Sequence, residues 1–322
     1  MKMETTMKAK ILVLMAVLTG TLSFQLGPVV RSATSTTMLF DLFGKKPNYG
    51  GNSSPVIGNK PTGPNNMPKL YDAWFKKSGQ MSKLMTSSAK SALSKHRQIE
   101  IFFNPVPNLD EIDFGTPLNQ EFGKEMAVDL GLPEYKPGSL ARRYLLQFSQ
   151  IYWAKQLAQA LPGNIYVATL DGLKKDVITK PGKMKLANFV NGKGLENVQK
   201  GDTVIVVNPG GNSVWNKADK MFQDQKVVYL NSLVTETYDL GGPLKDLEQS
   251  LYFKRISKGY VLRVFPNKWE VYLDKPDFTT EKLAVFDEKP KLREASKLTM
   301  QESMERYGVN NDRWAAGFGG RL

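Results

Sequence analysis

One loop of this chain combines residue types that could bind an anion. It follows an apolar run, residues 202–207 (DTVIVV), and precedes a helical pattern, as a strand-to-helix connection would. Glycines at such a point let backbone N–H groups approach a phosphate, and the helix dipole favours negative charge there. The candidate ligand-binding residues of this loop are Asn208, Gly210, Gly211, Asn212 and Ser213. A tight loop that turns the chain back into a helix explains the same residues.

The spacing after Gly211 matches a P-loop only in part. Lys217 stands at the position of the P-loop lysine, but Asn216 replaces the second glycine and Ala218 replaces the magnesium-binding Ser or Thr. The pattern does not match GxGxxG either. These departures do not justify a phosphotransferase activity.

Two other polar residues follow predicted strands. Asp171 follows residues 164–169 (NIYVAT), and Asn231 follows residues 226–230 (KVVYL). Functional groups of α/β sheets gather at the carboxyl ends of parallel strands, so both residues are candidate ligand contacts. Asp171 precedes Gly172, and an Asp-Gly turn accounts for it equally well. Because no general base better than an ordinary Asp is found, no catalytic residue is predicted.

Composition excludes several classes of site. The chain has no cysteine and a single histidine, His96. Thiolate nucleophiles, cysteine-ligated zinc and ordinary iron–sulfur clusters are thereby excluded. A Ser-His-Asp triad or a site with several histidines is nearly excluded as well. We therefore expect neither a metal nor another cofactor.

Two segments are candidates for contact with a membrane or a partner protein. The first helical pattern, about residues 70–92, is rich in lysine and contains one acid, Asp72. Such a helix either packs on a sheet with its lysines in water or docks on an anionic surface. The candidate contacts are Lys76, Lys77, Lys83 and Lys90 in this pattern, and Arg313 and Trp314 in the Gly-rich tail. A single tail with aromatic and basic residues does not by itself indicate nucleic-acid binding, and we do not expect a nucleic-acid partner.

The order of the predicted elements indicates an α/β fold. The first part alternates strands, at residues 98–103, 164–169, 202–207 and 226–230, with helices, at residues 116–130, 139–161 and 214–222. Three closely spaced strands follow and are expected to be antiparallel, at residues 251–256, 260–265 and 269–273. A last helix is predicted at about residues 291–306. The expected architecture is a Rossmann-like three-layer sheet, parallel in its first part and antiparallel near the C-terminus.

The N-terminal residues have the composition of a two-part targeting leader. A basic start and a short apolar run, residues 11–22, predict a signal peptide over residues 1–23. Residues 24–46 are rich in Ser, Thr and Arg, with Asp41 as their acid, which is typical of a plastid transit peptide. An uncleaved membrane anchor and ordinary secretion are the alternatives. The expected location is the plastid stroma or the stromal face of the thylakoid.

Composition also predicts the boundaries that follow the leader. Residues 47–68 are rich in Pro, Gly and Asn and are expected to be a disordered linker. A single α/β domain is expected over residues 69–293, and residues 294–322 comprise the end of the last helix and a Gly-rich tail.

A series of short motifs resembles a known family. The motifs are, in order, Asn208-Pro209, VVYLNSL at residues 227–233, Tyr252-Phe253, the strand at 260–265, PNKWEVY at 266–272, and Lys289-Pro290. Their order is similar to that in a plastid and cyanobacterial family of unknown biochemical function, over about residues 69–293. The family includes the low photosystem II accumulation type of assembly factor and the C-terminal module of some plastid adenylate kinases. Here no P-loop precedes the domain, so the adenylate kinase module is absent.

The resemblance implies a non-enzymatic plastid factor that helps photosystem II subunits assemble at the thylakoid. It supplies no catalytic residues, and Asn231 and Trp269 are landmarks of the family only. The implied partners are thylakoid or photosystem assembly proteins, with anionic lipid as a further contact. The alternative function is a soluble plastid enzyme or binding protein for a small phosphorylated or anionic ligand, at the carboxyl ends of the strands.

Overall fold

The computed structural model describes residues 79–107, 117–170, 177–232, 247–275 and 280–307. All of them belong to the second of two compact units, Pro47–Leu322. The predicted leader, the linker and the tail lie outside the described residues. Within the described part, no helix is long and apolar enough to cross a membrane.

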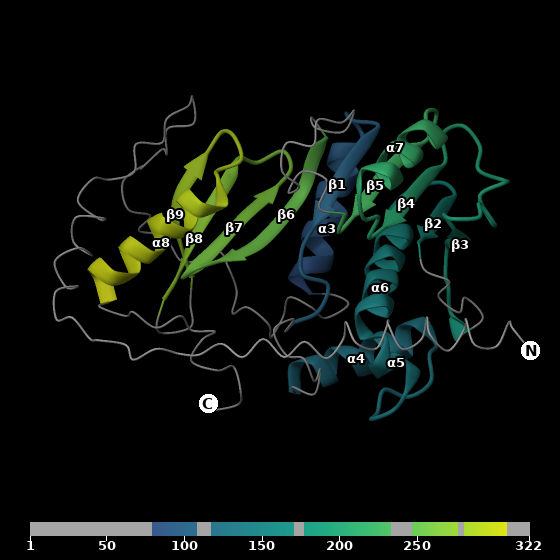
Figure 1. Cartoon of the computed structure of the whole chain (residues 1–322), viewed down its shortest axis with the longest axis horizontal. Coiled ribbons are helices and arrows are strands. Elements are labelled where there is room, and N and C mark those ends of the chain that lie inside the picture. The colour runs from purple at the N-terminus through teal and green to yellow at the C-terminus, as the bar shows by residue number, and fades with distance from the viewer. Residues whose placement is uncertain (1–78, 108–116, 171–176, 233–246, 276–279, 308–322) are drawn as a thin grey trace, which may run out of the picture. The chain divides into compact units, whose positions relative to one another are not determined.

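The described strands form one mixed sheet of nine strands (Figure 1). Its parallel part comprises β1 (Gln98–Phe102), β2 (Ile165–Thr169), β3 (Met184–Asn188), β4 (Thr203–Val207) and β5 (Lys226–Leu230). Its antiparallel part comprises β6 (Glu248–Ile256), β7 (Gly259–Val264), β8 (Trp269–Asp274) and β9 (Thr280–Phe286). The spatial order is β3-β2-β4-β5-β1-β6-β7-β8-β9, and β6 joins the two parts because it pairs in parallel with β1. The predicted mixed α/β sheet is therefore confirmed.

Helices cover both faces of this sheet. The helices of the first face are α3 (Gln80–Leu93), α4 (Pro117–Leu130), α5 (Leu140–Arg143) and α6 (Leu145–Ala160), and their apolar residues share one core with β1 to β8. On the second face, α7 (Asn212–Met221) packs on the parallel strands and α8 (Leu292–Tyr307) on the antiparallel strands, through two separate apolar clusters. This arrangement leaves β1 at the boundary between the two clusters of the second face.

The predicted elements agree with the structure except at four places. The first helix, predicted for about residues 70–92, is described from Gly79 onward, and Gly79 is extended (φ −76°, ψ 179°), so α3 begins at Gln80. Strands β3 and β9 were not predicted, because their sequences (MKLAN and TEKLAVF) carry lysines and lie at the two edges of the sheet. The single helix predicted for residues 139–161 is wrong, since the chain leaves helical geometry at Tyr144 (φ −116°, ψ 37°) and forms α5 and α6. Tyr144 itself is 41% exposed. The Ser139 side chain caps α5 by accepting a hydrogen bond from Arg142 N.

Gly131 follows the last residue of α4. Its φ of +68° favours glycine, and an added Cβ would lie 2.2 Å from Thr179 Oγ1. Thr179 Oγ1 donates to Gly131 O (2.9 Å), and Lys180 N donates to Leu130 O (3.1 Å). The close approach of residues 179–180 to the end of α4 therefore requires glycine at this position.

Candidate functional site

Two of the predicted site residues, Asn208 and Asn231, lie at the carboxyl ends of the neighbouring parallel strands β4 and β5. Asn208 follows β4, and its N–H donates to Leu230 O on β5 (2.8 Å). Asn231 follows β5, and its N–H donates to Ile101 O on β1 (2.7 Å). The expectation that these residues share one edge of the sheet is therefore confirmed. Asp171 lies outside the described residues.

The glycine loop after β4 is held by the helix that follows it. Trp215 Nε1, on the buried side of α7, donates to Pro209 O (2.6 Å). Gly211 is the N-cap residue with φ +88°, and it offers no side chain to cap α7, whose first turn contains no acid. Gly210, Gly211 and Ser213 are exposed, and an added Cβ at either glycine would meet nothing within 4 Å. The start of α7 is thus open to water.

The lysine that gave the partial P-loop match does not face this loop. Because α7 begins at Asn212, Lys217 lies in its second turn. Its Nζ donates to the carbonyl oxygens of Phe189 and Val190, at 3.2 Å each, and lies 5.0 Å from the centre of the Phe189 ring. Lys217 therefore fixes the turn after β3 to α7, and the P-loop spacing reflects no phosphate-binding arrangement.

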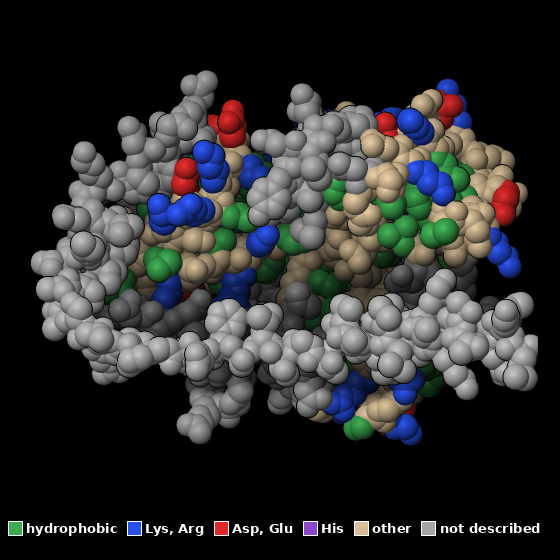
Figure 2. Space-filling view, viewed as in Figure 1, with side chains coloured by type: hydrophobic (Ala, Val, Ile, Leu, Met, Phe, Trp, Pro, Cys, Tyr) green, Lys and Arg blue, Asp and Glu red, His purple; other side chains and the backbone are tan. Residues whose placement is uncertain are grey.

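An open depression of about 460 Å³ lies on the outer side of α7. The residues that line it are Ser213, Asn216, Lys217, Lys220 and Met221. In Figure 2, hydrophobic side chains lie beside Lys or Arg side chains over this part of the molecule. The depression combines apolar and cationic surface, and it is too open to exclude water from a reaction.

Comparisons of the chain with protein-family models, with curated proteins and with solved structures found no match.

Both polar atoms of the Asn231 side-chain amide form hydrogen bonds within the fold. It is 5% exposed and adopts φ +53°, a conformation that Asn tolerates better than most residues. Its Oδ1 accepts from Phe103 N (2.8 Å), and its Nδ2 donates to Gln150 Oε1 on α6 (2.7 Å). Asn231 thus joins the ends of β5 and β1 to α6. These structural hydrogen bonds account for an asparagine at position 231, and no bound ligand is needed to explain it.

A buried glutamate on β1 was missed by sequence reasoning. Glu100 is 0% exposed, and its carboxylate accepts hydrogen bonds from Ser232 Oγ (2.9 Å) and Gln249 Nε2 (3.0 Å). Ser250 Oγ also donates to the backbone oxygen of Glu100 (3.3 Å). The residue ties β5, β1 and β6 together at the boundary between the two apolar clusters of the second face. The available signal was a single acid within the strand sequence QIEIFF.

Tyr229 is the neighbour of Glu100 in the strand register and carries an unusual hydroxyl. It is 0% exposed, and its OH has no hydrogen-bond partner among the described residues. Burial raises the pKa of Tyr229 and the Asp219 carboxylate raises it further, whereas Arg97 lowers it, so the phenol is neutral at pH 7. An unsatisfied buried hydroxyl opposes folding.

We therefore expect the substitution Tyr229→Phe to raise the free energy of unfolding by about 1 kcal/mol. Urea denaturation followed by tryptophan fluorescence measures this change. The matched control is Tyr166→Phe, because Tyr166 is also buried in the same cluster but donates to Asn197 O (2.9 Å). The control should lose about 1 kcal/mol. Equal losses in both variants would show that the Tyr229 hydroxyl has a partner.

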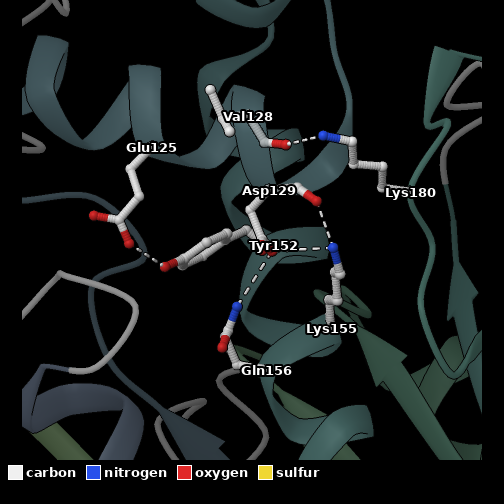
Figure 3. A network of polar contacts seen from close by, with 7 residues as sticks. All are labelled: Glu125, Val128, Asp129, Tyr152, Lys155, Gln156 and Lys180. Atoms are coloured by element: carbon white, nitrogen blue, oxygen red, sulfur yellow. Dashed lines mark hydrogen bonds and ion pairs between the residues drawn. The ribbon is translucent and has the colours of Figure 1, made fainter.

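Lys155 forms a second buried polar network, on α6 (Figure 3). Its Nζ lies 3.2 Å from Asp129 Oδ2 and also donates to Asp129 O, with side-chain exposures of 5% and 6% for the two residues. Gln156 Nε2 donates to the same carboxylate oxygen (3.3 Å), and Lys180 Nζ donates to Val128 O (3.3 Å). Two ammonium groups thus cap carbonyls at the C-terminal end of α4, where the helix dipole favours cations. A buried lysine is here a structural cap.

Acidic residues do not gather into a metal site in the part of the chain that the structure describes. No group of three or more His, Asp or Glu side chains there could hold a metal ion. The side chain of His96 is 39% exposed, its Nε2 lies 3.9 Å from Glu248 Oε2, and its ring packs edge-on against Phe265.

Helix α3 presents an exposed face without acids. Met81, Met85 and Ala92 are buried, while Lys83 and Lys90 are exposed. The two lysines are seven residues apart and so lie on one stripe, about 10 Å from each other. Neither forms an ion pair or a side-chain hydrogen bond with any residue that the structure describes. Of the other predicted contacts, Lys76, Lys77, Arg313 and Trp314 lie outside the described residues.

Proposed function

We propose that this chain is a plastid-targeted, non-enzymatic factor that assists photosystem II assembly at the stromal face of the thylakoid. The leader and the family resemblance support this assignment. The structural observation that carries it is the exposed stripe of α3, where Lys83 and Lys90 stand in water without an acidic neighbour on their helix. Such a stripe fits an anionic lipid surface or an acidic protein surface.

The strength of this contact suits reversible docking. A lysine close to an anionic membrane surface contributes about 1 kcal/mol. Two such residues therefore strengthen binding roughly 30-fold, since 1.4 kcal/mol corresponds to a factor of ten. Charge interactions of exposed residues are screened over about 8 Å at physiological ionic strength, so the contact should weaken with salt.

Vesicle flotation tests the membrane contact directly. We expect the full-length chain to bind phosphatidylcholine vesicles more strongly when they contain phosphatidylglycerol. The double substitution Lys83→Glu/Lys90→Glu should reduce the part of binding that depends on phosphatidylglycerol at least about tenfold. The leader is the same in every variant, so it does not affect the comparison between variants.

The matched control is Lys193→Glu/Lys297→Glu, which changes the net charge equally at two exposed lysines away from α3. This control should bind at least half as strongly as the unchanged chain. If both double variants lost binding to the same degree, the attraction would depend on net charge and the assignment of α3 as the docking helix would fail.

We also propose that the parallel part of the sheet is Rossmann-like. The connection from β1 to β2 contains α4 to α6 on one face of the sheet, and the connection from β4 to β5 contains α7 on the other face, as in doubly wound sheets. After β2 the chain moves to β3, at the edge of the sheet, and after β4 it moves to β5, toward the middle of the sheet. The chain therefore leaves the neighbouring strands β2 and β4 in opposite directions across the sheet. The departure is the position of β1, which lies between β5 and β6.

A further inference from the structure

We propose that the outer surface of α7 and the turn after β3 bind an acidic segment of a partner protein that inserts an apolar side chain. This inference adds a protein-docking surface to the proposed role as an assembly factor, and it rests on residues other than the lysines of α3. The surface comprises Val190, Lys217, Lys220 and Met221 around the depression on α7.

Val190 is exposed to solvent on a turn whose backbone is fixed by hydrogen bonds. It is 63% exposed, although it is a β-branched apolar residue. Asn188 Oδ1 accepts from Val190 N (2.8 Å) and from Asn191 N (3.1 Å), which closes the turn on itself. Lys217 Nζ then bonds the carbonyl oxygen of Val190. These bonds fix the exposed valine, so little conformational entropy is lost when a partner covers it.

Met221 provides a second exposed apolar group on the same surface. It is 42% exposed and lines the depression one helical turn after Lys217, which itself contacts the valine turn. A single exposed apolar residue is ordinary on a protein surface. Here Val190 and Met221 lie on either side of Lys217, next to the depression. Methionine adapts its shape to an inserted side chain. The depression therefore suits a side chain that protrudes from a polypeptide rather than a flat bilayer.

The charges around the depression select an acidic partner. Lys217 and Lys220 are exposed on α7, and the uncapped N-terminal turn of the helix adds partial positive charge. The acid of α7, Asp219, is turned away, because its Oδ1 accepts from Gln98 Nε2 (2.7 Å) and lies 3.4 Å from Arg97 Nη2. Carboxylates of a partner would therefore meet cations around an apolar contact.

A random-peptide display library tests this chemistry with no assumed partner sequence. The library would be selected on the full-length chain and on the variant Val190→Ser/Lys220→Glu. We expect peptides enriched on the unchanged chain to carry net negative charge and at least one large apolar residue. Their affinity should fall at least tenfold on the variant. Both substituted side chains are exposed, so the melting temperature of the variant should stay the same.

The control variant is Lys297→Glu, which reverses an exposed lysine on α8, the other helix of the same face. It should bind the enriched peptides as the unchanged chain does. Enrichment of basic peptides, or of peptides that bind both proteins equally, would overturn the proposal. Binding of inorganic phosphate that is lost in the variant would instead identify a small-anion site and also overturn it.

Vesicle binding separates this proposal from the proposed function. Val190→Ser/Lys220→Glu should retain the phosphatidylglycerol-dependent vesicle binding of the unchanged chain, whereas Lys83→Glu/Lys90→Glu should retain peptide binding. Loss of vesicle binding in the α7 variant would place the membrane contact on α7 and contradict the peptide site. If Lys83→Glu/Lys90→Glu did not change vesicle binding, the proposed function would fail. The peptide experiment would still test the α7 surface by itself.

Discussion

Replacing Lys155 with alanine is expected to lower the free energy of unfolding by roughly 3–5 kcal/mol, the usual loss when one partner of a buried ion pair is removed. Lys155 and Asp129 have side-chain exposures of 5% and 6%, and Lys155 Nζ lies 3.2 Å from Asp129 Oδ2. Without the ammonium group, the Asp129 carboxylate and carbonyl oxygen would stay buried and lose a charged donor. Urea denaturation followed by circular dichroism measures this loss.

Two further variants show whether the buried charge causes the effect. Lys180→Ala removes an exposed ammonium group that donates to Val128 O at the same helix end, and it should cost less than about 1 kcal/mol. Lys155→Met/Asp129→Asn removes both charges and should recover more than half of the loss seen in Lys155→Ala. A double variant that is less stable than Lys155→Ala would contradict the account of this network.

Replacing Asn231 with alanine should be similarly costly, by roughly 3–5 kcal/mol. Phe103 N would lose its acceptor and Gln150 Oε1 its donor, at a residue that is 5% exposed. Alanine would also have to adopt φ +53°, which Asn tolerates better. Thermal and urea denaturation measure the change.

The contributions of backbone and side chain at Asn231 can be separated. Asn231→Gly relieves the backbone strain but still lacks the amide, so it should recover only about 1 kcal/mol of the loss. Asn208→Ala is the surface control, since Asn208 also has positive φ (45°) but is exposed, and it should cost about 1 kcal/mol. If Asn231→Ala were as mild as Asn208→Ala, the Asn231 amide would not be structural, and a role in ligand binding would regain support.

Much of the fold could be predicted because its central strands are strongly patterned. The runs TVIVV in β4 and KVVYL in β5 are buried over most of their length, which continuous apolar sequence predicts. The edge strands β3 and β9 were missed because an edge strand carries polar residues that resemble a loop. The break at Tyr144 was missed because the apolar spacing continues through it, while tertiary packing determines the backbone there.

The candidate site was less predictable than the fold. Sequence spacing placed Asn208 and Asn231 at one edge of the sheet, since parallel order alone determines which ends meet. It could not show that the Asn231 amide bonds Phe103 and Gln150, because those partners are distant in sequence. The same reason applies to Lys217, whose spacing resembled a P-loop while its ammonium group bonds a turn that follows another strand.

The most direct test of the proposed function is the native location of the chain. A tagged full-length copy would be expressed in an alga, its thylakoids solubilised gently and separated on a native gel, and the co-migrating proteins identified by mass spectrometry. We predict co-migration with partly assembled photosystem II, reduced when Lys83 and Lys90 are both replaced by glutamate. A soluble monomer in the stroma, unchanged by these substitutions, would contradict the account.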